Sequence, residues 1–147
     1  MSEIALRNVC KQFDSEHYGV KDFNLDIHDK EFVIFVGPSG CGKSTTGRTI
    51  LRLGGEKTGG QVLFNGKEVY DMTPAEMRAL RTQMQIIFQD PFSSLSPRLP
   101  VGEIIGEAVR EHNLVPKNEF NDYIDQVMDD CGLQPYHKTR YPHEFSG

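Results

Sequence analysis

One run of eight residues has the types and spacing of a phosphate-binding loop. It fits the pattern Gly-x-x-x-x-Gly-Lys-[Ser/Thr] and reads Gly37-Pro38-Ser39-Gly40-Cys41-Gly42-Lys43-Ser44. Glycine lets a backbone curl until successive N–H groups point inward at phosphate oxygens. The run therefore predicts a loop that binds the phosphates of a nucleoside triphosphate.

Three side chains at the end of this loop have predicted roles. Lys43 would place its ammonium against the β- and γ-phosphates, which predicts a catalytic role for it. The Ser44 hydroxyl is a hard oxygen ligand that suits Mg²⁺. Thr45 would donate a hydrogen bond to a phosphate from the next position. The predicted cofactors are thus ATP and Mg²⁺.

A loop of this kind lies between a strand and a helix, and the sequence predicts both. Residues 31–36 are a continuous apolar, β-branched and aromatic run that ends at Gly37, which is typical of a central strand buried on both faces. A helix is predicted from Ser44 to Leu53, and the glycines that follow are typical of a helix end.

The rest of the chain predicts a β-rich start followed by helices. Asn-Gly at 65–66 favours the tight turn of a hairpin, and Thr73-Pro74-Ala75-Glu76 is a capping box that begins a helix to about Thr82. Two helices are expected from apolar periodicity at 101–109 and at 120–131, the second with Asn118 as its cap. Further strands are expected at 4–9, 24–27, 61–64, 67–69 and 84–88.

Composition excludes several classes of protein. The formal net charge is −5 and no dense Lys/Arg run is present, which argues against a nucleic-acid partner. The longest apolar stretch, 32–36, is far shorter than the ~20 residues of a membrane span, so a membrane role would act through a partner. The spacing of the cysteines predicts free thiols rather than a zinc site or a disulfide framework: Cys10, Cys41 and Cys131.

Two later segments, taken with the loop, resemble the ATP-binding subunit of an ABC transporter. Gln85-Ile86-Ile87-Phe88-Gln89-Asp90-Pro91 follows the loop, and Tyr141-Pro142-His143-Glu144-Phe145-Ser146-Gly147 comes last. The resemblance implies an α/β fold, namely a P-loop NTPase of ABC type with an N-terminal antiparallel β region and a helical subdomain, incomplete at the C-terminus. It implies one partial ATP-binding domain over 1–147, with a β-rich part at about 1–72 and a Q-loop and helical subdomain at about 73–140.

The resemblance also assigns roles that the residues alone would not. Phe13 matches the aromatic residue that stacks on adenine in this family, although a lone Phe after a strand is ordinarily packing. Gln89 matches the glutamine of the Q-loop, which implies a catalytic role and a place in the Mg²⁺ shell. The final Phe145-Ser146-Gly147 is similar to the start of the family signature, which reads the γ-phosphate on an opposing subunit.

Different parts of the chain are similar to different branches of the family. Residues 86–105 and 44–48 are similar to oligopeptide and dipeptide importers, whereas 21–27 and 36–40 look like the sugar-importer branch. We therefore expect a junction of two paralogous sequences near 40–47. The implied partners are membrane-spanning transporter subunits and a second ATP-binding subunit, at the cytoplasmic, inner face of the cell membrane.

Hydrolysis is a separate question from binding. The family's catalytic Glu follows a strand that ends in Asp, and no Asp-Glu pair occurs in 1–147. We expect these residues alone to hydrolyse ATP negligibly. The alternative is a truncated or recombined nucleotide-binding protein without catalysis. A soluble ABC ATPase ranks below the importer because of the importer-like segment, and a P-loop kinase or GTPase ranks lower still because Asn-Lys-x-Asp is absent.

Overall fold

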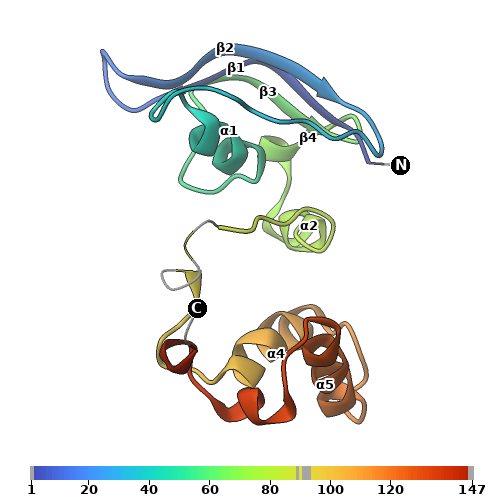
Figure 1. The fold of residues 1–147 in the computed structure, drawn as a ribbon. Helices are drawn as coiled ribbons and strands as arrows, with labels where there is room; N and C mark the ends of the chain where they lie inside the picture. Colours follow the sequence, from blue (N-terminus) through green and yellow to red (C-terminus); the bar gives the residue numbers. More distant parts are fainter. Residues whose placement is uncertain (1, 89, 91–93, 146–147) are drawn as a thin grey trace. The chain divides into compact units, whose positions relative to one another are not determined.

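A four-stranded antiparallel sheet with the order β2-β1-β3-β4 dominates the first part of the chain (Figure 1). The computed structural model describes residues 2–88, 90 and 94–145, and the chain divides into two units, Met1–Ile86 and Ile87–Gly147. The strands of the first unit are β1 (Ile4–Gln12), β2 (Tyr18–Ile27), β3 (Gly59–Phe64) and β4 (Lys67–Glu68).

The predicted hairpin between β3 and β4 is confirmed. The two strands pair antiparallel, with Phe64 opposite Lys67. Asn65 and Gly66 have φ values of 49° and 78°, the left-handed conformations that a two-residue hairpin turn requires. The strands predicted at 4–9 and 24–27 are also present, but both are longer because they pair with each other along most of their length.

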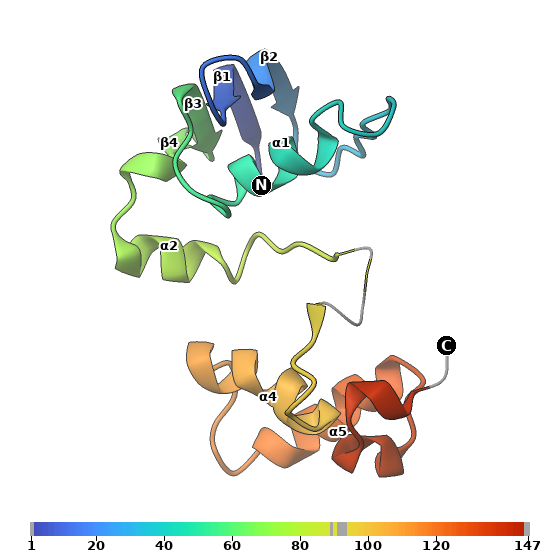
Figure 2. The ribbon, with the colours of Figure 1, turned by 90° about the vertical axis from the view of Figure 1, so that its left-hand side faces the viewer.

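Two helices pack with this sheet. α1 (Lys43–Ile50) lies against one face of the sheet, as Figures 1 and 2 show from two directions. α2 (Pro74–Leu80) follows the short 3-10 helix η1 (Val69–Asp71). The sequence grouped α2 with the later helices, whereas its buried side chains join the core of the sheet. That core consists of Leu6, Val9, Val62, Phe64, Val69, Met72, Met77 and Leu80.

Tyr70 connects η1 to the end of α1. Its hydroxyl donates a hydrogen bond to the Thr49 carbonyl at 3.0 Å, and its ring lies beneath the guanidinium of Arg52 at 5.5 Å. Burial raises the pKa of Tyr70 to about 12, because the phenolate would lose hydration there. The hydroxyl therefore stays protonated and keeps holding the last turn of α1.

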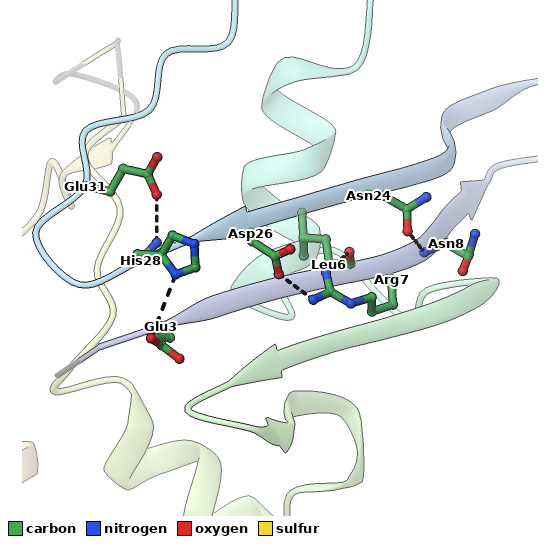
Figure 3. A network of polar contacts seen from close by, with 8 residues as sticks. All are labelled: Glu3, Leu6, Arg7, Asn8, Asn24, Asp26, His28 and Glu31. Carbon is green, nitrogen blue, oxygen red and sulfur yellow. Dashed lines mark hydrogen bonds and ion pairs between the residues drawn. The ribbon is translucent and has the colours of Figure 1, made fainter.

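Polar contacts fix the turn that leads from β2 towards the loop (Figure 3). The backbone N–H of His28 donates to the Glu31 carboxylate at 2.8 Å, and the N–H of Glu31 donates to the His28 carbonyl at 3.0 Å. The His28 ring also lies 3.9 Å from the Glu3 carboxylate at the start of β1. Further along the same two strands, Arg7 of β1 and Asp26 of β2 form an ion pair.

The capping box predicted at the start of α2 is confirmed. The Thr73 hydroxyl accepts from the Glu76 N–H, and the Glu76 carboxylate accepts from the Thr73 N–H at 2.8 Å. The same carboxylate accepts a hydrogen bond from the Lys67 ammonium. Chiefly because of Lys67, and next because of Thr73, the pKa of Glu76 falls from 4.5 to about 2.

This pKa makes the start of α2 sensitive to acid. Because the folded-state pKa lies below the unfolded one, the carboxylate adds stability above about pH 4.5, and this stability is lost as the pH falls towards 2. Glu76→Gln is expected to flatten the dependence of Tm on pH over this window. Thr73→Ala should lower stability by about 1 kcal/mol even at low pH, because the cap on the Glu76 N–H is lost. It should also weaken the pH dependence, since the Thr73 hydroxyl donates to the Glu76 carboxylate at 2.9 Å. Thermal melts at stepped pH check both, and an unchanged profile for Glu76→Gln would contradict the assignment.

Two of the predicted strands are wrong. Neither 31–36 nor the described residues 84–88 form a strand, and the residues Phe32, Val36 and Ile87 are 85%, 90% and 97% exposed. A central strand needs neighbours that pair with its backbone and cover both of its faces. In the part of the chain that the structure describes, no strand of the antiparallel sheet pairs with either segment.

The second unit is helical. It contains α4 (Val101–His112), α5 (Phe120–Asp130) and the 3-10 helices η2 (Pro135–Thr139) and η3 (Pro142–Glu144). Both predicted helices are confirmed, but α5 begins after Glu119, so Asn118 is not its cap. Their core is Val109, Ile124 and Met128. Among the described residues, no helix combines the length and apolar character that crossing a bilayer requires.

Candidate phosphate-binding site

Between residue 36 and α1, the loop contains glycines with left-handed backbone, a conformation that other residues rarely adopt. Gly40 has φ +82°, and Gly42, the residue before α1, has φ +93°. Gly42 then accepts the first helical hydrogen bond, from the Thr46 N–H at 2.8 Å. Since the first N–H groups of an α-helix have no partner within the helix, those of α1 point back towards this loop.

Lys43 folds over the loop that precedes it. Its ammonium donates to the carbonyls of Gly37 and Pro38, each at 2.7 Å, and lies 3.3 Å from the Cys41 sulfur. The charge of Lys43 is therefore held directly above the loop backbone. A phosphate oxygen carries a negative charge that a carbonyl lacks, so it attracts the ammonium more strongly, and a polyphosphate would compete well for Lys43.

Gly42 also fixes α1 against the sheet. A Cβ at Gly42 would lie 2.2 Å from the carbonyl oxygen of Gly19, in β2. No side chain fits in that space, so the loop backbone approaches β2 as closely as a glycine allows. Two buried threonines of α1 satisfy their hydroxyls on the preceding turn: Thr46 donates to the Gly42 carbonyl at 2.9 Å, and Thr49 donates to the Thr45 carbonyl at 2.8 Å.

The predicted Mg²⁺ ligand is accessible. Ser44 is the second residue of α1 and is exposed beside Lys43, where its hydroxyl can reach a cation held by phosphate oxygens. Mg²⁺ is bound by few protein oxygens and keeps several waters, so one hydroxyl at this position fits its chemistry. Among the described residues, no cluster of three or more His, Cys, Asp or Glu could hold a metal ion.

Phe13 lies beside the first turn of α1. It follows β1, its N–H donates to the His17 carbonyl at 2.9 Å, and the residue is 65% exposed. The turn behind it is fixed by Asp14, whose carboxylate accepts from the N–H groups of Glu16 and His17 at 3.0 and 2.9 Å. The Glu16 N–H is the first cause that lowers the pKa of Asp14, and His17 adds to it.

The structure thus brings together Phe13 and the loop with its helix, which the sequence placed far apart. The other predicted site residues are not brought to this loop in the part of the chain that the structure describes. Gln89, Ser146 and Gly147 lie outside the described residues. Phe145 belongs to the second unit, where its ring centroid lies 5.0 Å from that of His137.

A hollow of about 530 Å³ adjoins the loop, and sequence reasoning missed it. It is lined among others by Tyr18, Gly19, Lys21, Cys41 and Lys43. Gly19 is the informative member, because a lone glycine inside a strand indicates a close approach of another segment. That signal was present in the sequence, but nothing there said which segment approaches.

Comparisons with known proteins show to which family this chain is similar. The ABC transporter family model matches residues 20–147. The glutathione import ATP-binding protein GsiA of Escherichia coli O6:H1 is 44% identical over 132 residues, which is 90% of this chain and 21% of that protein. Its counterpart from Shigella dysenteriae serotype 1 is 43% identical over 148 residues, which is 100% of this chain and 24% of that protein. The chain spans about a quarter or less of the length of these relatives.

Solved structures agree on the fold. The ATP-binding cassette MJ0796, in a dimeric post-hydrolysis state bound to ADP and Pi, has a TM-score of 0.78 and 25% identity, over 97% of this chain and 63% of that chain. For cbiO1 from Clostridium perfringens, described as part of the ABC transporter complex cbiONQ, the TM-score is 0.72 with 23% identity, over 97% and 55%. The predicted α/β fold of ABC type is confirmed. With a family match over most of its length, this chain belongs to the ABC transporter family.

Proposed function

We propose that this chain binds ATP with Mg²⁺ at Gly37–Ser44, as part of the ATP-binding subunit of an ABC importer. The observation that carries the proposal is the Lys43 ammonium, held 2.7 Å from two loop carbonyls at the N-terminus of α1. An ammonium, inward-curled backbone and a helix N-terminus together favour a polyanion. The binding set is Gly37, Pro38, Ser39, Gly40, Cys41, Gly42, Lys43, Ser44 and Thr45, with Phe13 for the adenine ring.

The proposed roles follow from the chemistry of each group. Lys43 neutralises charge on the β- and γ-phosphates, and loop N–H groups orient them. Ser44 supplies a Mg²⁺ ligand, and the bound ion would neutralise further charge on the phosphate oxygens. For Gln89, which we propose for the Mg²⁺ shell and for orienting water, the support is the family resemblance alone.

Ser44 gives a direct test of the Mg²⁺ role. Ser44→Ala is expected to remove most of the gain in ATP affinity that Mg²⁺ provides, because the hydroxyl ligand is lost. Ser44→Thr is the matched control and should keep that gain, since threonine carries the same hydroxyl. Calorimetric titrations of ATP with and without Mg²⁺ compare the variants. An alanine variant that responds to Mg²⁺ as the parent does would contradict the assignment.

The proposed transport role rests on the relatives. Proteins named as glutathione import ATP-binding proteins support a subunit that powers solute import, and glutathione supports a peptide as the solute. We propose membrane-spanning transporter subunits and a second ATP-binding subunit as partners, at the cytoplasmic face of the membrane. A dimer of ATP-binding cassettes among the solved relatives supports the second subunit. One relative aligns along the whole chain, including residues 40–47. The expected junction of two paralogous sequences in that segment stays a prediction.

Binding without hydrolysis is the second candidate for residues 1–147 alone. It is favoured by the absence of an Asp-Glu pair in the sequence, and hence of the family's catalytic carboxylate. The test is steady-state phosphate release beside equilibrium binding of Mg-ATP. Saturable binding with negligible release is the expected result. Turnover on the order of 1 per second or faster would overturn the second candidate, and absence of binding would overturn both.

A further inference from the structure

Gly19, near the start of β2, lies where the β1–β2 hairpin meets the phosphate-binding loop and α1. Its carbonyl lies beneath Gly42, as described above. On its other side, a Cβ at Gly19 would lie 2.6 Å from Cε2 of Phe13 and 2.8 Å from Cγ2 of Thr45. The aromatic ring and the methyl group therefore occupy the space that any side chain at this position would fill.

The missing side chain at Gly19 determines where the Phe13 ring can lie. With no side chain at Gly19, the ring packs down beside Thr45, in the first turn of α1. Phe13 is still 65% exposed, which leaves a surface for a planar ligand to stack on. The stacking surface and the phosphate-binding turn are thus adjacent because of one missing Cβ.

We infer that Gly19 is a positioning residue for the nucleoside part of the ligand. It lets Phe13 lie close enough to α1 for one molecule to stack its base on the ring while its phosphates lie in the loop. This inference rests on the proposed function and extends it, because it distinguishes a polyphosphate that carries an aromatic base from one that does not. A base-free polyphosphate gains nothing from Phe13.

A Gly19→Ala variant should keep the fold. Gly19 is not among the residues with left-handed backbone, so alanine meets no conformational strain. The group nearest to the new Cβ is the far end of the Phe13 ring, which can swing into solvent. Gly47→Ala is the matched control, because a Cβ at Gly47, within α1, would meet nothing within 4 Å.

The experiment is calorimetric titration of the full chain with Mg-ATP and, separately, with Mg-tripolyphosphate. Phe13→Ala is expected to weaken ATP binding roughly tenfold, the typical loss for one base stacked on an aromatic ring. Gly19→Ala should weaken ATP binding severalfold, and in the Phe13→Ala background it should cause no further loss. Tripolyphosphate affinity should stay within about twofold in Phe13→Ala, which leaves the loop untouched. In Gly19→Ala it should fall by clearly less than ATP affinity, because there the new Cβ also displaces the Thr45 methyl group. Gly47→Ala should match the parent chain.

Three outcomes would overturn the inference. Equal losses for ATP and tripolyphosphate in Gly19→Ala would mean that Gly19 acts through Gly42 and the loop. Additive losses for Phe13→Ala and Gly19→Ala would mean that the two residues act separately. If the parent binds ATP no tighter than tripolyphosphate, no base subsite exists here, although the proposed phosphate site stands. Failure of the parent to bind either ligand would overturn the proposed function as well.

Discussion

Lys43→Ala is expected to lower the affinity for both Mg-ATP and Mg-tripolyphosphate by roughly 100-fold. Hydrogen bonds to charged groups contribute about 1.5–3 kcal/mol each, and 1.4 kcal/mol is a factor of ten in affinity. Lys43 places its ammonium directly over the loop, 2.7 Å from the carbonyls of Gly37 and Pro38. Removing it takes away the positive charge that faces the phosphates. Equilibrium titration with both ligands measures the loss.

Lys21→Ala is the matched control for this variant. Lys21 lines the same hollow, but its ammonium lies over the Tyr18 ring at 5.2 Å rather than over the loop. Both variants change the net charge equally, so general electrostatic attraction falls equally. The control should lose no more than about threefold, since an exposed charge is screened by salt. Equal losses in the two variants would contradict a specific role for Lys43.

Gly42→Ala is expected to disable the loop almost as completely. An L-residue in left-handed backbone costs about 1–2 kcal/mol, and the new Cβ would also lie 2.2 Å from the Gly19 carbonyl oxygen. That atom belongs to the backbone of β2, so α1 itself must move away. We expect a clear fall in Tm and at least a tenfold loss of affinity for tripolyphosphate. Thermal melts and titration measure the two effects.

Gly40→Ala separates the two causes. Gly40 has a similar backbone, with φ +82°, but a Cβ there would meet nothing within 4 Å. It carries the conformational cost alone, so it should be the milder variant in both measurements. If Gly40→Ala were as damaging as Gly42→Ala, the close contact with Gly19 would have no special importance.

Much of this fold could be predicted because the signals are local. The Asn65-Gly66 turn, the Thr73 capping box and the periodicity of α4 and α5 depend on residues close together in sequence. The strands expected at 31–36 and 84–88 were predicted wrongly because strand pairing depends on residues far apart in the sequence. An apolar, β-branched run shows that a segment suits a buried strand, but its neighbours are set by distant parts of a chain.

The candidate site shows the same limit. The loop from Gly37 to Ser44 is visible because its residue types and spacing are tied to one chemistry. The proximity of Phe13 to that loop depends on how β1 and β2 pair across their register shifts, which no local pattern shows. The resemblance to the ABC family pointed to Phe13, but only the three-dimensional structure shows the close packing at Gly19.

The most direct test of the central claim is heteronuclear NMR of the unmodified chain titrated with Mg-ATP. If the loop binds the triphosphate, the backbone amides of Gly40, Gly42, Lys43 and Ser44 should show the largest shifts, saturating with one Kd. Mg-tripolyphosphate should shift the same amides. Shifts that are absent from this loop at saturating Mg-ATP, or confined to residues elsewhere in the chain, would contradict the claim that Gly37–Ser44 is the phosphate site.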